Sequence, residues 1–358
     1  MIYSHLAKPT GGGEKPLPAA GATARNTGID IVRCFAIMCV LCVHFSLNTR
    51  FYASEVNSVS MFLQSTFRTL FLMGVPLFLM LTGYLNINKR VERRYYYGCI
   101  RVLLSYLFIA LIVVAYRIYC LGEVRPWWQW VSRITSFRAD PYAWYIAMWI
   151  GLFILTPLLN IWWRGLETRR SRQILIATLF CVVCIPIAIN RHGSRLIPDY
   201  WSEIYPLLYY FMGAYIREYR PRIPKRTLAI IVAAICLVNP VVNALLIHGR
   251  PQWLIVSQVC GIGAAILAPT VFMLLYDIEV KSSALKKCFM HVSLLSLDMY
   301  LISYIADNTL YPYFMERWYV NQSQFGAFFF VIVPLVFVSS FAFSWIKMRL
   351  FRLAGLPT

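Results

Sequence analysis

Long apolar runs alternate with short polar stretches along almost the whole 358-residue chain. Most runs reach about 20 residues, the length that a helix needs to cross the roughly 30 Å hydrocarbon core of a bilayer. Ten such segments can be delimited, the sixth being the shortest: residues 29–47, 61–85, 96–118, 142–163, 173–190, 203–216, 227–248, 253–276, 291–312 and 323–346. The pattern predicts an all-α integral membrane protein with about ten transmembrane helices.

The two ends of the chain lack this pattern. Residues 1–27 contain a run of three glycines and no periodic apolar positions, so we expect a disordered cytoplasmic tail. The tail and the apolar run after it lack the features of a signal peptide. We expect one transmembrane domain over residues 28–350 and a short cytoplasmic tail over residues 351–358.

Basic residues predict the orientation of the helices. With the N-terminus in the cytoplasm, 22 of the 34 lysines and arginines fall in cytoplasmic segments and 9 in outer segments. The remaining three, Arg33, Arg68 and Arg101, lie within predicted spans. Because Lys and Arg accumulate in cytoplasmic loops, both termini are expected in the cytoplasm.

Composition strengthens the membrane prediction and removes other classes. The chain is 59% hydrophobic and 14% charged, with a mean hydropathy of +0.61, whereas soluble domains are about 25% charged. The polar stretches are too short for a soluble domain of the usual size. The net charge of +19 is explained by cytoplasmic loops, so membrane lipid is the expected partner and nucleic acid is not. No metal site is predicted, since the two Cys-x-x-Cys pairs lack further ligands.

Two ionisable residues in the first span call for an explanation, because such a group costs about 2.5–3.5 kcal/mol at the bilayer centre. Arg33 and His44 are 11 residues apart, which places them within roughly 20° of one helical face and about 16 Å apart along the axis. We expect them to line one cavity at two depths. Two simpler interpretations stay open: Arg33 pairs with Asp30, and His44 makes a structural hydrogen bond to a neighbouring helix.

Four motifs in order resemble the acyltransferase-3 family of integral membrane acyltransferases. Asp30, Arg33 and His44 resemble the motif of its first helix, and residues 75–85 (VPLFLMLTGYL) resemble that of its second. Residues 144–159, which begin WYI and end LTPLL, and residues 296–302 (SLDMYLI) resemble two later motifs. The resemblance covers nearly the whole chain after residue 28 and fits the stand-alone branch, without a fused extracytoplasmic domain.

The chain departs from the family pattern at two places. The arginine pair expected at the start of the third span falls on Gly98 and Arg101, so only the second arginine is present. Arg90 and Arg93 have the same spacing upstream and are the expected substitute. The late histidine of the family is replaced by Ser303.

The resemblance implies a membrane O-acyltransferase of the bacterial inner membrane. It would move an acetyl or other short acyl group from cytoplasmic acyl-CoA, with acetyl-CoA the expected donor, to a hydroxyl of a surface polysaccharide or its lipid-linked glycan precursor. Arg33, Arg90, Arg93 and Arg101 are the expected ligands of the CoA phosphates, although positive-inside charge alone also explains the loop arginines. His44 would act as general base or carry the acyl group itself.

Other residues receive weaker predictions. Asp307 is expected at the height of His44, where it would orient the imidazole, and Asp298 would counter Arg33 or Arg101. Residues 74–76 (GVP) are expected to kink the second span. Trp127, Trp128 and Trp130 would stack on sugar or anchor the interface, and Arg68 would bind an anionic glycan carrier or reach toward the outer surface.

A transporter or flippase is the alternative function, with Arg33 and His44 marking a substrate or proton path. Transporters often contain paired repeats with broken helices at corresponding positions. The chain has no second Arg-x10-His spacing and no second Pro-kinked segment in the matching place, which favours the enzyme. Acceptor, acyl group and oligomeric state are not predicted.

Overall fold

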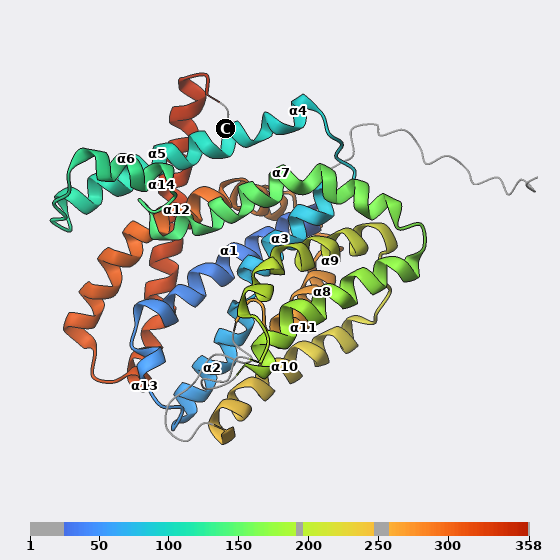
Figure 1. Ribbon diagram of the computed structural model, residues 1–358. Coiled ribbons are helices and arrows are strands. Elements are labelled where there is room, and N and C mark those ends of the chain that lie inside the picture. The colour runs from blue at the N-terminus through green and yellow to red at the C-terminus, as the bar shows by residue number, and fades with distance from the viewer. Residues whose placement is uncertain (1–24, 191–195, 247–257, 357–358) are drawn as a thin grey trace, which may run out of the picture.

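The computed structural model describes residues 25–190, 196–246 and 258–356, and the regular structure in these ranges is entirely helical (Figure 1). The predicted tail before residue 25 lies outside the described residues, as do residues 357–358. The helices are α1 (Thr27–Asn48), α2 (Val59–Phe71), α3 (Gly74–Asn86), α4 (Arg93–Tyr96), α5 (Gly98–Tyr119), α6 (Trp127–Thr135), α7 (Trp144–Gly165), α8 (Arg169–Ile189), α9 (Tyr205–Tyr219), α10 (Lys225–Leu246), α11 (Ile262–Leu275), α12 (Ser283–Trp318), α13 (Gln322–Phe325) and α14 (Phe329–Leu353). Short 3₁₀ turns join several of them, among them η1 (Phe51–Ala53) and η2 (Pro141–Ala143).

Eight helical segments among the described residues are long and apolar enough to cross a membrane. The α2 and α3 helices form one of these segments together. The other two predicted segments correspond to α9 and α11, which are shorter at 15 and 14 residues, and residues 253–257 of the predicted eighth segment lie outside the described ranges. The prediction of an all-α, multi-pass membrane protein is confirmed.

Helix α1 lies in the middle of the bundle, packed against α12, α3, α2, α14 and α11 (Figure 1). It begins at a capped end, where the Asn26 side chain accepts the Gly28 amide N–H at 2.9 Å. Its central position means that polar residues on it face other helices rather than lipid. The α12 helix, 36 residues long, is one of the helices that cover it and extends beyond both ends of the predicted span.

The second span breaks where the GVP sequence predicts. Pro76 is the third residue of α3, and α2 ends at Phe71, so the regular α-helical hydrogen bonding is interrupted at Leu72 and Met73, although both residues keep right-handed helical dihedral angles. A proline cannot donate to the carbonyl four residues before it and its ring crowds that carbonyl, which accounts for the break before α3. A Cβ at Gly74 would lie 3.0 Å from the Ala36 carbonyl oxygen, so glycine allows α3 to approach α1 closely.

Helices α3 and α9 cross through a pair of glycines. A Cβ at Gly83 would overlap the carbonyl oxygen of Tyr210, and one at Gly213 would overlap that of Met80. Small residues let two membrane helices bring their backbones together. This contact fixes α3, whose residues form one wall of the cavity described below.

Candidate active site

A buried histidine and aspartate face each other across α1 and α12. The Nδ1 atom of His44 lies 2.9 Å from Oδ2 of Asp307, and the two residues are 5% and 1% exposed. The sequence places Asp307 near the height of His44, and the structure brings the pair into hydrogen-bond contact. An imidazole that donates Nδ1–H to a carboxylate has Nε2 left as the nitrogen that can accept a proton.

Tyr142 completes this arrangement and was not predicted from the sequence. Its hydroxyl donates to the same Oδ2 of Asp307 at 2.6 Å, and its ring centroid lies 4.2 Å from that of His44. Oδ1 of Asp307 is buried without a hydrogen-bond partner among the described residues. One carboxylate oxygen therefore holds the histidine and the tyrosine together, and the other remains able to accept a further hydroxyl.

The segment before α7 positions Tyr142. Oδ1 of Asp140 accepts the Tyr142 amide N–H at 2.8 Å, and the Tyr142 carbonyl accepts the Tyr300 hydroxyl at 2.6 Å. Asp140 is fully buried, and this burial raises the pKa of its carboxyl to about 7. The sequence around Tyr142 shows only an Asp-Pro turn before a helix that begins with aromatic residues. This pattern does not indicate which residues Tyr142 contacts.

An ion pair fastens the loop that leads to this segment. Arg117, at the end of α5, donates to both carboxylate oxygens of Glu123 at 2.8 and 3.0 Å and to the Ala139 carbonyl at 2.7 Å. The hydrogen bonds from Arg117 lower the pKa of the Glu123 carboxyl. The clamp draws the end of the loop against α5 and so places Asp140 and Tyr142 beside α12.

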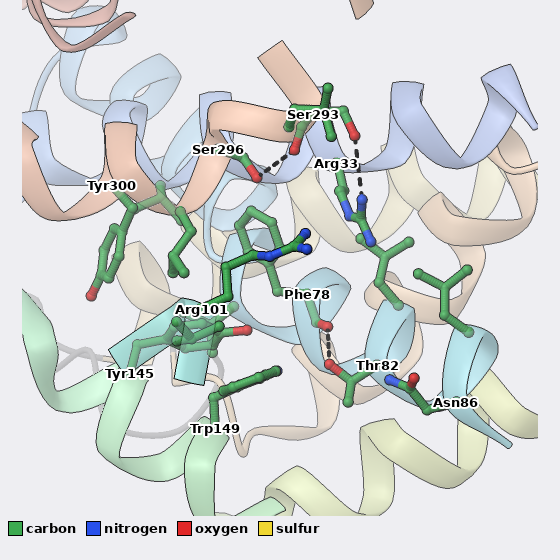
Figure 2. A pocket seen from close by; sticks show the side chains of 17 residues that line it. Arg33, Phe78, Thr82, Asn86, Arg101, Tyr145, Trp149, Ser293, Ser296 and Tyr300 are labelled. Atoms are coloured by element: carbon green, nitrogen blue, oxygen red, sulfur yellow. Dashed lines mark hydrogen bonds between the residues drawn. The ribbon is translucent and has the colours of Figure 1, made fainter. Parts of the chain in front are cut away.

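A cavity of about 340 Å³ lies between α1, α3, α5, α7 and α12. Arg33 from α1 and Arg101 from α5 both project into it, as Figure 2 shows. Arg33 donates to Oγ of Ser293 at 3.5 Å. The Asp30 carboxylate instead receives two bonds from Arg25, each at 2.7 Å, so the simpler pairing of Arg33 with Asp30 is not what the described residues show.

The expectation of one cavity shared by Arg33 and His44 is met only at the arginine end. The lining includes Tyr145 and Tyr300 but not His44. The Tyr300 ring centroid lies 6.2 Å from that of His44, and the Tyr142 ring packs against both, at 4.2 Å from His44 and 5.8 Å from Tyr300. A wall of tyrosines therefore separates the imidazole from the cavity. Helical periodicity predicted that the two residues share one face of the first helix. It carried no information on the aromatic side chains that pack against that face.

The four predicted phosphate ligands do not gather at one place. Arg33 and Arg101 line the cavity, whereas Arg90 and Arg93 are exposed and absent from its lining. Arg93 instead donates to the Tyr97 hydroxyl at 2.8 Å. Arg90 lies in the loop before α4 and Arg93 is the first residue of α4, and neither side chain lines the cavity, since the Arg-x-x-Arg spacing alone does not fix where the side chains lie.

Asp298 has a different partner from the predicted one. Its carboxylate pairs with Nζ of Lys347 at 2.8 Å rather than with Arg33 or Arg101. The hydropathy boundary at residue 346 placed Lys347 just beyond the tenth predicted span, in a cytoplasmic segment, but α14 continues to Leu353 and buries this lysine. An ion pair compensates the buried charge, and hydropathy alone cannot predict such a pair.

The structure also places Arg68 and the three tryptophans of the predicted outer loop. Arg68 is buried and donates to the Tyr52 hydroxyl at 2.8 Å, in the η1 turn between α1 and α2. Trp127 and Trp128 are 74% and 58% exposed, which suits either of their two predicted roles. Trp130 is buried beneath Arg117 and is available for neither.

No group of three or more His, Cys, Asp or Glu side chains suited to a metal ion occurs among the described residues. A family model described as an acyltransferase domain matches residues 26–349. Comparison with curated proteins and with solved structures gives no match. The matched range includes α1, the cavity, the tyrosine wall and the His44–Asp307 pair.

Proposed function

Because the chain belongs to the acyltransferase-3 family, we propose that it transfers an acetyl or other short acyl group from acyl-CoA to a hydroxyl of a surface polysaccharide or its lipid-linked glycan precursor. We place it in the inner membrane of a bacterium. One observation carries the proposal: a cavity that holds two arginines ends at a tyrosine wall, and a buried His–Asp pair lies directly behind that wall.

The cavity suits the donor by its chemistry. Guanidinium groups form strong, charge-assisted and often bidentate hydrogen bonds with phosphate, and Arg33 and Arg101 offer two such groups. Apolar side chains, including Phe78 and Trp149, line the remaining wall and would contact the neutral pantetheine arm. The thioester would then point toward Tyr300.

The His44–Asp307 pair supplies the base. Asp307 holds Nδ1–H, so Nε2 removes the proton of the acceptor hydroxyl as its oxygen attacks the thioester carbonyl. A C–O bond forms, the C–S bond breaks, and the thiolate leaves with the proton that His44 returns. General base catalysis contributes about 10²–10⁴-fold to such a step. Transfer through an acyl-histidine is the second route open to the same side chain.

Access to His44 requires a movement of the wall. The Tyr300 hydroxyl is bonded to the Tyr142 carbonyl, which holds the ring between the cavity and the imidazole. Rotation of the Tyr300 ring breaks one hydrogen bond and opens a path along α1. The wall would keep the donor thioester away from the histidine until the acceptor is in place.

The test compares surface glycans from cells that carry wild-type protein, His44→Ala or His291→Ala. His291 is half-buried and, among the described residues, its ring bonds only to the Lys287 carbonyl of its own helix, so it is a matched control. We expect acyl substituents, measured by mass spectrometry, to disappear in His44→Ala and to persist in His291→Ala. Normal acylation in a membrane-inserted His44→Ala protein would rule out this mechanism.

A further inference from the structure

A second groove, of about 190 Å³, lies between α5, α12 and α14. It shares Arg101, Val102, Leu294 and Leu297 with the first cavity, so the two spaces lie on either side of Arg101. Leu294 is 51% exposed, which shows that the groove opens at the outer surface of the helix bundle. None of its other charged residues has a part in the proposed transfer.

The inner wall of the groove is a buried polar triad from the three helices. Nζ of Lys347 bonds to Oγ of Ser105 at 2.5 Å and to Oδ2 of Asp298 at 2.8 Å, and Ser105 also donates to Asp298. The side chains of Lys347 and Asp298 are 6% and 13% exposed. Moving such a pair out of water costs several kcal/mol per ion, so its presence on an internal surface calls for a reason.

The groove has an excess of positive charge. Lys347 and Asp298 neutralise each other, which leaves Arg101 and Arg352. Neither arginine forms an ion pair among the described residues, and the one hydrogen bond found for Arg352 goes to Sδ of Met348 on its own helix at 3.4 Å. Two guanidinium groups therefore line the groove without an anionic partner from the described chain.

We propose that this groove is a binding site for a phosphate group. Guanidinium forks match the geometry of phosphate oxygens, and the Lys347–Asp298–Ser105 wall behind them is held by its own hydrogen bonds and adds no net charge. Apolar residues beside the arginines, Met348 and Phe351 among them, suit a ligand that joins a phosphate to an apolar portion.

Two ligands share this chemistry. One is the nucleotide end of the CoA donor, which would lie in the groove beside Arg101 while the pantetheine arm occupies the first cavity. This ligand rests on the proposed function. The other is the headgroup of an anionic phospholipid that enters from the bilayer between α5 and α14. This ligand does not rest on the proposed function.

The experiment uses full-length protein in nanodiscs and compares Arg352→Gln with Arg349→Gln. Arg349 is on the same helix, rests on the Trp345 ring and does not line the groove. CoA and 3′-dephospho-CoA binding are measured by calorimetry in phosphatidylcholine nanodiscs, and retention of phosphatidylglycerol is measured by native mass spectrometry. Loss of one charge-assisted bond predicts about tenfold weaker binding in Arg352→Gln and no change in Arg349→Gln.

The arms separate the sources. If Arg352→Gln weakens CoA binding but not the retention of phosphatidylglycerol, the ligand is a phosphate of the donor. If it weakens the retention of phosphatidylglycerol but not CoA binding, the ligand is the lipid headgroup. If it weakens both, the groove accepts either ligand. Equal behaviour of the two variants toward every probe overturns the proposal. Failure of the proposed function shows separately, as normal glycan acylation in His44→Ala, and leaves the lipid result valid.

Discussion

Asp307 shares one carboxylate oxygen between His44 and Tyr142, so the two contacts can be tested one at a time. Asp307→Asn removes the charge that holds the imidazole and should lower kcat by at least about a hundredfold. Tyr142→Phe keeps the ring against His44 but loses one charge-assisted bond, and should lower kcat by about tenfold.

Tyr304 provides the control for these variants. Its ring contacts that of Tyr142, and its hydroxyl has no hydrogen bond among the described residues, so Tyr304→Phe should retain the wild-type rate. The rates are measured as initial velocities of acyl transfer by purified protein. A Tyr142→Phe protein as active as Tyr304→Phe would show that Tyr142 does not position Asp307.

Asp140 gives a pH dependence to stability. Burial raises the pKa of its carboxyl to about 7 in the folded protein, above the usual value of about 3.9. Its stabilising effect is complete below the unfolded pKa and is lost as pH rises through 7. The thermal unfolding temperature of the wild type should therefore fall between about pH 4 and pH 7 and level off above, and Asp140→Asn should flatten this slope. If the unfolding temperatures of the wild type and of Asp140→Asn changed with pH in the same way, Asp140 would not be the group that causes this pH dependence.

The sequence predicted the residues that helical periodicity places and missed those that tertiary contacts place. Arg33, His44 and Asp307 lie on helices, where spacing and depth follow from position along the chain. Tyr142 reaches His44 through tertiary contacts, among them the Arg117–Glu123 clamp and the hydrogen bond from the Tyr300 hydroxyl to the Tyr142 carbonyl. Arg90 and Arg93 were predicted from their spacing alone, and neither lines the cavity.

At the level of elements, the crossing of α3 and α9 depends on glycine. Gly83→Ala would force the two backbones apart and should destabilise the fold by about 1–3 kcal/mol, as overpacked interiors do. Gly151→Ala on α7 is the control, because nothing lies within 4 Å of the added Cβ. Thermal unfolding in detergent measures both, and equal unfolding temperatures would contradict the proposed close contact.

The break between α2 and α3 was predictable because proline chemistry is local. The end of α14 was not, because the hydropathy pattern stops at the first charged residue, whereas the helix continues as far as its contacts support it. Lys347 stays in the helix since Asp298 and Ser105, from two other helices, satisfy its ammonium group.

At the level of the whole molecule, topology can be tested with native cysteines. Cys120 follows α5 and Cys288 lies near the start of α12, and both are exposed. The predicted orientation places Cys120 outside and Cys288 inside the cell. An impermeant thiol reagent should label a variant that retains only Cys120 in intact cells, and one that retains only Cys288 after permeabilisation alone. The reverse labelling would invert the predicted topology.

The all-helical, multi-pass architecture followed from apolar run length, because the thickness of the bilayer sets one dimension of every span. The shape of the cavity did not follow, since it depends on how side chains from five helices pack together. Tyr145 and Tyr300 show this: each lies within a motif that resembles the family, yet no motif indicates that their rings close the path to His44.

The most direct test of the account is steady-state kinetics of purified protein with labelled acetyl-CoA and extracted surface glycan. Arg33→Gln should raise the KM for the donor by about tenfold and change kcat little, because one phosphate contact is lost. His44→Ala should lower kcat by about 10²–10⁴-fold with the donor KM nearly unchanged. A His44→Ala enzyme with wild-type kcat would contradict the central claim that this imidazole is the base.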